Sequence, residues 1–126
     1  YNCEATIENT LLTVINQDYE CLEYVIIDGK STDKTLSIIE PYKNKIQRIV
    51  SEKDKGIFDA MNKSLKYITG EYVLFMNAGD TFANNHVVSD IFNTYIGDDD
   101  LIYGDDYVRN DLGYMFRKAS SISDKL

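Results

Sequence analysis

The chain has 126 residues, 44% of them hydrophobic and 12% aromatic, which suits one domain with a hydrophobic core. Its formal net charge of −8 provides no basic stripe for phosphates, so we exclude a nucleic-acid partner. No apolar run approaches the roughly 20 residues that span a bilayer, and no signal-peptide pattern is present. Cys3 and Cys21 stand far apart without a C-x-x-C motif, which favours free thiols in a cytoplasmic protein.

The chain opens with a predicted helix and a predicted strand. Between residues 3 and 17, apolar side chains recur on one helical face, at Ile7, Leu11, Val14 and Ile15. Asn2 is the expected N-cap of this helix. The β-branched run at residues 24–28 then predicts a short strand that ends in a carboxylate, Asp28.

A turn, a helix, a second strand and a third helix follow. Ser31 or Thr32 is expected to cap the helix after the turn, and Pro41 to end or kink it. Residues 47–51 predict the second strand. The clearest helical spacing of the chain covers residues 57–68.

The second half of the chain is organised around the run at residues 71–76. Five consecutive apolar positions predict a buried strand of a parallel sheet, directly after a helix stop at Gly70. A helix over residues 88–95 and a brief strand at residues 101–103 come next. Residues 105–116 suggest a β-hairpin.

Polar side chains follow each predicted strand. They are Asp28, the residues 54–59, the residues 77–80, and Asp105 with Asp106. A single aspartate at a strand end is more often a helix cap or a turn former than a ligand. Four successive strand ends, however, meet at the same edge of a parallel sheet, which is where such sheets bind ligands. The sequence therefore predicts a binding site at this edge.

Over nearly its whole length the chain resembles the inverting, GT-A-fold glycosyltransferases of family 2, in a bacterial polysaccharide-type subgroup. The motifs that carry the resemblance occur in the family's order, at residues 1–2, 10–17, 23–33, 54–63, 69–80 and 103–105. The resemblance implies a GT-A-type three-layer α/β/α sandwich with a mostly parallel sheet. It also implies transfer, with inversion, of a sugar from a nucleotide diphosphate sugar, a UDP-sugar, to a saccharide or lipid-linked acceptor.

The resemblance assigns residues to the nucleotide sugar. Tyr1 and Asp28 match positions that hold the nucleotide base, with a helix cap as the alternative role for Asp28. Asp54, Gly56 and Asp59 match a stretch beside the nucleotide, where a helix start offers N–H groups to an anion. Asp59 is equally well explained as a favourable charge in the first turn of its helix.

The resemblance also implies a metal ion, Mn²⁺ or Mg²⁺, held by Asp80. An acidic chain that binds a diphosphate needs a divalent cation between the two sets of negative charge. Asn77 and Gly79 replace two positions of this motif that are usually acidic. Gly79 therefore has no carboxylate for the ribose, whereas Asn77 retains a hydrogen-bonding side chain for the donor.

Two parts of the family's domain have no match in residues 1–126. In the implied topology a strand before Tyr1 lies between the runs 24–28 and 72–76, so we expect residues before Tyr1, or another chain, to fill that place. Direct pairing of these two runs would contradict this expectation. The general base is expected beyond Leu126, in the acceptor-binding half, so no catalytic residue is assigned.

The alternatives are a sugar nucleotidyltransferase and a non-catalytic α/β nucleotide-binding module. For the transferase we expect a cytoplasmic location, at the inner face of the membrane through peripheral association.

Overall fold

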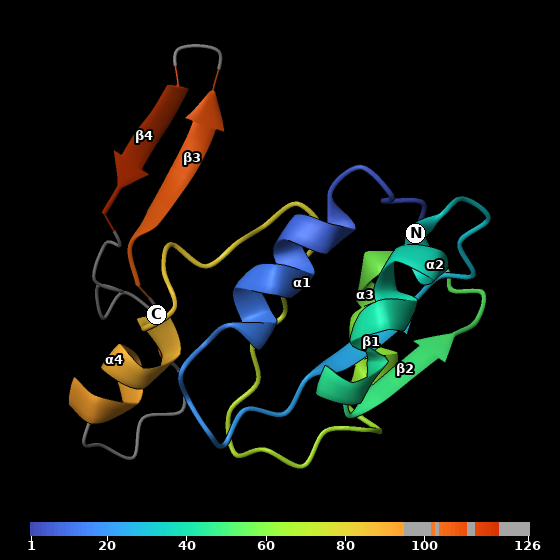
Figure 1. The fold of residues 1–126 in the computed structure, drawn as a ribbon, viewed down its shortest axis with the longest axis horizontal. Coiled ribbons are helices and arrows are strands. Elements are labelled where there is room, and N and C mark those ends of the chain that lie inside the picture. Colours follow the sequence, from blue (N-terminus) through green and yellow to red (C-terminus); the bar gives the residue numbers. More distant parts are fainter. Residues whose placement is uncertain (95–101, 103, 111–112, 119–126) are drawn as a thin grey trace, which may run out of the picture. The chain divides into compact units, whose positions relative to one another are not determined.

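The computed structural model describes residues 1–94, 102, 104–110 and 113–118, and the chain divides into two units, Tyr1–Tyr95 and Ile96–Leu126. The first unit contains a two-stranded parallel sheet with helices (Figure 1). Its elements are α1 (Ile7–Ile15), β1 (Val25–Asp28), α2 (Thr35–Ile39), a 3₁₀ helix (Glu40–Lys45), β2 (Arg48–Ser51), α3 (Ile57–Ser64) and α4 (Val87–Thr94). The second unit contains β3 (Asp106–Asn110) and β4 (Gly113–Arg117).

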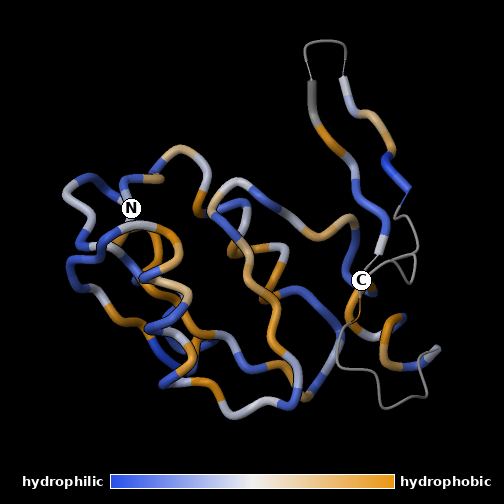
Figure 2. Tube along the Cα trace, turned by 180° about the vertical axis from the view of Figure 1, so that it is seen from behind, coloured by the Kyte–Doolittle hydropathy of each residue, from blue (hydrophilic) through white to orange (hydrophobic). Residues whose placement is uncertain are grey.

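The core of the first unit lies between the sheet and the first two helices. β1 pairs with β2 from Val25 opposite Arg48 to Asp28 opposite Ser51. Helices α1 and α2 pack together, and α3 contacts β1. The buried side chains of this core are Ile7, Leu11, Ile26, Ile39 and Ile46. Hydrophobic stretches of the chain meet there, as the hydropathy colouring of Figure 2 shows.

Most of the predicted elements are present. The helix expected within residues 3–17 is α1, the strands expected at 24–28 and 47–51 are β1 and β2, and the helix expected at 88–95 is α4. The helix expected over residues 57–68 is α3, which already ends at Ser64. These predictions are confirmed because helical and strand periodicities are local properties of the sequence.

The predicted N-cap of α1 is wrong. The helix begins after Thr6, without a side-chain cap. Asn2 instead has a φ of 48°, and its Oδ1 accepts a hydrogen bond from the Thr32 N–H at 2.9 Å. Asn2 therefore joins the N-terminal segment to the turn after β1 rather than starting a helix.

The predicted cap of α2 is also wrong. Neither Ser31 nor Thr32 caps the helix; the Oδ1 of Asp33 accepts a hydrogen bond from the N–H of Thr35, the first residue of α2, at 2.9 Å. The expected effect of Pro41 is confirmed, since α2 ends two residues before it and the chain continues as a 3₁₀ helix.

The run at residues 71–76 does not form the predicted strand. Val73, Leu74 and Phe75 are 47%, 66% and 41% exposed, and residues 71–76 belong to no strand. An isolated bridge between Ala78 and Asp80 lies just beyond the run. Among the described residues β1 pairs with β2 alone, so this run has no neighbouring strand to complete a ladder. The run is not paired with β1 either. Direct pairing of these two runs would have contradicted the expected strand between them, and it does not occur.

The second unit confirms the predicted hairpin. β3 and β4 are antiparallel, with Tyr107 opposite Phe116 and Asp106 opposite Arg117. Arg117 donates two hydrogen bonds to the Asp106 carboxylate, at 2.8 and 2.7 Å. The strand predicted at residues 101–103 can be compared with the structure at one residue, Ile102, which belongs to no strand. The other two residues lie outside the described part of the chain. No helix in the described ranges is long and apolar enough to cross a membrane.

Candidate functional site

Asp28 ends β1, and its carboxylate is buried among hydrogen-bond donors. It accepts from the Ser31 N–H at 2.9 Å, from the Ser31 hydroxyl, and from the Ser51 hydroxyl at 2.6 Å. Burial raises the pKa of Asp28, but the bonds from Ser31 and Ser51 outweigh it and hold the pKa below 3.8. Asp28 thus ties the end of β1 to the end of β2 and to the following turn. It does not cap a helix, the alternative role expected from the sequence, because α2 begins only at Thr35.

Gly29 brings three segments of the chain together. A Cβ atom on Gly29 would lie 2.5 Å from Oδ2 of Asp54 and 3.3 Å from Cβ of Tyr1. The N-terminal segment, the end of β1 and the loop after β2 therefore meet where only glycine leaves room. Tyr1 and Asp54, two of the residues that the resemblance assigns to the nucleotide, thus lie beside the residue that follows Asp28. The sequence analysis did not assign Gly29 to the site. Its position directly after Asp28, at the end of a strand, is the feature of the sequence that indicates such a role.

Asp54 and Asp59 organise the start of α3. The Oδ1 of Asp54 accepts from the Gly56 N–H at 3.0 Å, and the Oδ2 of Asp59 accepts from the Lys55 N–H at 2.9 Å. Asp59 also forms an ion pair with Lys63 at 3.3 Å. The Lys55 N–H, with help from Lys63, holds the pKa of Asp59 below its ordinary value. Both carboxylates thus stabilise a helix start.

The loop at residues 77–80 carries the predicted metal ligand. The carboxylate of Asp80 is exposed and accepts from Nδ2 of Asn77 at 3.2 Å, and the Asp80 N–H donates to the Asn77 carbonyl at 3.0 Å. Gly79 has a φ of 110°, a conformation in which any side chain is strained. The backbone therefore explains why no acidic residue occupies that position.

Asp80 and Asn77 provide this loop with side-chain oxygens of the kind that bind Mg²⁺. Within the described residues no group of three or more His, Cys, Asp or Glu side chains is placed to bind a metal. Asp80 and Asn77 offer hard oxygen ligands, and Mg²⁺ in proteins is commonly held by one or two carboxylates together with phosphates and water. Asp80 and Asn77 are therefore the oxygen ligands that this loop would offer a divalent cation.

The predicted residues fall into two groups in the first unit. One group is Tyr1, Asp28, Asp54, Gly56 and Asp59, and the other is Asn77, Gly79 and Asp80. In the part of the chain that the structure describes, no hydrogen bond or ion pair joins Asp80 to the first group. Asp105 and Asp106 belong to the second unit, where Asp106 pairs with Arg117.

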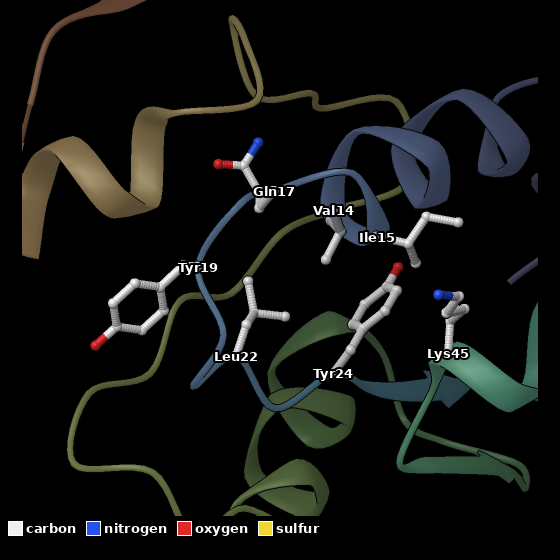
Figure 3. Close-up of a pocket in the computed structure, with 7 residues that line it drawn as sticks. All are labelled: Val14, Ile15, Gln17, Tyr19, Leu22, Tyr24 and Lys45. Atoms are coloured by element: carbon white, nitrogen blue, oxygen red, sulfur yellow. The ribbon is translucent and has the colours of Figure 1, made fainter.

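A small cavity of about 120 Å³ lies elsewhere in the first unit (Figure 3). It is found where the chain leaves α1 and approaches β1, at the amino ends of the strands, and none of the predicted site residues lines it. Burial raises the pKa of Tyr24 in its wall to about 12, so this phenol is neutral at physiological pH. The lining residues are Val14, Ile15, Gln17, Tyr19, Leu22, Tyr24 and Lys45. None of these lining residues has a carboxylate, so the cavity lacks the side chains that divalent cations prefer.

Comparison with known proteins places the chain in a family. Its sequence matches Glycosyl transferase family 2 over residues 1–123. It is 30% identical over 115 residues to a PGL/p-HBAD biosynthesis glycosyltransferase of Mycobacterium bovis, a match that covers 86% of this chain and 44% of the relative. The chain therefore belongs to glycosyl transferase family 2, and this membership implies the GT-A α/β fold, of which the β1–β2 sheet and its helices are part.

Two further relatives have more specific names. The UDP-Glc:alpha-D-GlcNAc-diphosphoundecaprenol beta-1,3-glucosyltransferase WfaP of Escherichia coli is 34% identical over 94 residues, which are 72% of this chain and 37% of the relative. The poly(ribitol-phosphate) beta-N-acetylglucosaminyltransferase TarS of Staphylococcus aureus is 36% identical over 95 residues, which are 71% of this chain and 16% of the relative. The chain thus spans less than half the length of these curated relatives.

Proposed function

We propose that the protein transfers a sugar from a nucleotide diphosphate sugar to a saccharide or lipid-linked acceptor, with inversion, in bacterial polysaccharide assembly. The observation that carries the proposal is the meeting of Tyr1, Gly29 and Asp54 at the strand ends of a family 2 chain. The names of the relatives support it: WfaP is named for UDP-Glc and a diphosphoundecaprenol-linked sugar, and TarS for a poly(ribitol-phosphate).

The nucleotide would bind over Gly29. The exposed ring of Tyr1 offers a face on which a base can stack. The first turn of α3, which Asp54 and Asp59 fix, points backbone N–H groups and the positive end of the helix dipole toward an anion. Asp28, through its bonds to Ser31 and Ser51, would hold the loop after β1 in the shape that receives the base.

Asp80, with Asn77 beside it, would hold Mn²⁺ or Mg²⁺ together with the two phosphates. Such an ion neutralises the negative charge that develops on the departing nucleoside diphosphate. The net charge of −8 adds to the need for a cation, because the chain itself repels a diphosphate. We place the reaction at the inner face of the membrane, where a lipid-linked acceptor is reached by peripheral association.

Titration calorimetry of the full-length protein with UDP tests this function. We expect the wild-type protein to bind UDP when Mn²⁺ is present. The affinity for UDP should fall at least about tenfold, a difference of about 1.4 kcal/mol, when the metal is removed by a chelator or when Asp80 is replaced in Asp80→Asn. Asp90→Asn, which removes an exposed carboxylate of α4, is the matched control and should bind as the wild type does. Absence of metal-dependent UDP binding by the wild type would contradict the proposal.

The same preparation separates the alternatives. Release of pyrophosphate from UTP and a sugar 1-phosphate would support a nucleotidyltransferase. Nucleotide binding without transfer or hydrolysis of any UDP-sugar would support a non-catalytic binding module.

A further inference from the structure

Helix α1 presents a row of polar side chains to the segment that carries Asp80. Thr10, Thr13 and Gln17 are spaced by three and four residues, so they share one face of the helix. All three form hydrogen bonds with the backbone of residues 79–88, about 70 positions away along the chain. This row joins α1 to the segment at several points along its length.

The bond nearest to the metal loop is made by Thr10. Its Oγ1 accepts a hydrogen bond from the Gly79 N–H at 2.8 Å, one residue before Asp80. One turn further along α1, Thr13 Oγ1 accepts from the Phe82 N–H at 3.4 Å. Thr10 is only 3% exposed and lies beside the apolar core position Leu11. A hydroxyl in such a place is costly unless it is hydrogen-bonded, and the partner that it has is the Gly79 N–H.

Gln17 closes the row at the far end of the segment. Its Nε2 donates to the Asn84 carbonyl at 2.7 Å, while its Oε1 accepts from the Val88 N–H at 3.1 Å. Both ends of the amide are therefore used by the chain on either side of the start of α4. The segment between Gly79 and Val88 is anchored at both ends to one rigid helix.

We propose that Thr10 is a positioning residue for Asp80. This inference rests on the proposed function. By holding the Gly79 N–H, Thr10 fixes the backbone next to Asp80 and so fixes the position from which the carboxylate would bind the metal ion. Without the acceptor, the exposed Gly79 N–H loses its partner on α1, and the backbone next to Asp80 is no longer fixed to the helix. Loss of the Thr10 hydroxyl should therefore lower the affinity for the metal in addition to lowering the stability of the fold.

The test compares two isosteric substitutions in the full-length protein. Thr10→Val removes the acceptor for Gly79. Thr35→Val removes an equally buried hydroxyl, at 2% exposure, which accepts from the Cys3 N–H at 2.9 Å and serves as the control. Both variants should melt a few degrees lower. The Mn²⁺ concentration for half-maximal UDP binding, measured by calorimetry, should rise about three- to tenfold in Thr10→Val and less than about twofold in Thr35→Val. Thr10→Ser, which keeps the oxygen, should restore the wild-type value.

Three outcomes would overturn the inference. One is an equal metal requirement in Thr10→Val and Thr35→Val, which would make Thr10 a purely structural residue. Another is failure of Thr10→Ser to restore the wild-type value. The third, which needs no variant, is rapid hydrogen exchange of the Gly79 amide in the wild type. If the wild type shows no metal-dependent UDP binding, the proposed function itself has failed, and the Gly79 exchange still reports on the contact.

Discussion

Single carboxylates in the candidate site shape the backbone around them. Asp28 accepts bonds from Ser31 and Ser51, Asp54 accepts from Gly56, and Asp59 accepts from Lys55. A buried or helix-starting carboxylate is stabilised by such donors, and its charge remains at neutral pH. These residues therefore build the site, whether or not they also touch the nucleotide. Asp80, by contrast, is exposed and has one side-chain partner within the described residues, Asn77.

Asp28→Asn should lower the free energy of unfolding by about 1–3 kcal/mol, because the amide turns a donor toward groups that already donate. Urea unfolding at neutral pH measures this change. Asp90→Asn on the surface of α4 is the control and should change the stability by less than about 0.5 kcal/mol. An Asp28→Asn protein as stable as the wild type would show that the three donors find other acceptors without cost.

At the scale of whole elements, the junction between α1 and α4 combines backbone and ionic contacts. The Asp18 N–H donates to the Asn85 carbonyl at 3.0 Å, and Nδ1 of His86 lies 2.6 Å from Oδ2 of Asp18. The Asp18 carboxylate raises the pKa of His86 above 6.5. The Ser89 hydroxyl and His86 lower the pKa of Asp18 below 3.8. The start of α4 is thus tied to the end of α1 by a pair that depends on pH.

His86→Gln should destabilise the protein only at pH values below the folded-state pKa of His86, which the Asp18 carboxylate raises above 6.5. The raised pKa means that the contribution of His86 is fully present below about pH 6.5, its ordinary value when unfolded, and disappears as the pH rises through the folded-state pKa. The lowered pKa of Asp18 sets the opposite limit, since its contribution is lost as the pH falls below about 3.8. Melting temperatures at pH 5.5 and pH 9 measure the difference between wild type and variant. An equal difference at both pH values would contradict the charge-pair explanation.

Among the residues that the structure describes, the core is small and much apolar surface is exposed. Five side chains form the buried cluster, while the run at Val73, Leu74 and Phe75 is exposed, as are Ile57 and Phe58 at the start of α3. A sheet of two parallel strands covers little of this surface. Parallel strands are usually buried on both faces and are therefore apolar throughout. The run at residues 73–75 has this apolar composition, but its side chains are exposed.

Leu74→Ala and Leu11→Ala test this difference in the 126-residue chain. Leu11 is completely buried, so its truncation should cost about 2–5 kcal/mol. Leu74 is 66% exposed, so its truncation should change the stability by less than about 0.5 kcal/mol. Urea unfolding of both variants gives the comparison. A cost for Leu74→Ala near that of Leu11→Ala would show that the run is buried as a strand, as its sequence predicts.

The sequence by itself determined the features that depend on neighbouring residues. The helices, the first two strands and the hairpin follow from spacings of three to four or two residues, and the family follows from motifs in order. The order of strand and polar turn also predicted that Asp28 and the loop at Asp54 lie at one edge of the sheet, and Gly29, directly after Asp28, lies against Asp54. Each of these signals is read within a short stretch of chain, so no tertiary contact is needed to find it.

Only the tertiary structure decided the contacts between distant residues. The apolar pattern at residues 71–76 predicts a strand, yet a strand requires a hydrogen-bonded neighbour, and none of the described residues supplies one. The caps failed for a related reason, since Asn2 bonds to Thr32 in the turn after β1 instead of to its own helix. Likewise nothing in the motif around Asp80 indicates that Thr10 holds the Gly79 N–H, because the two residues meet only when α1 packs against the loop.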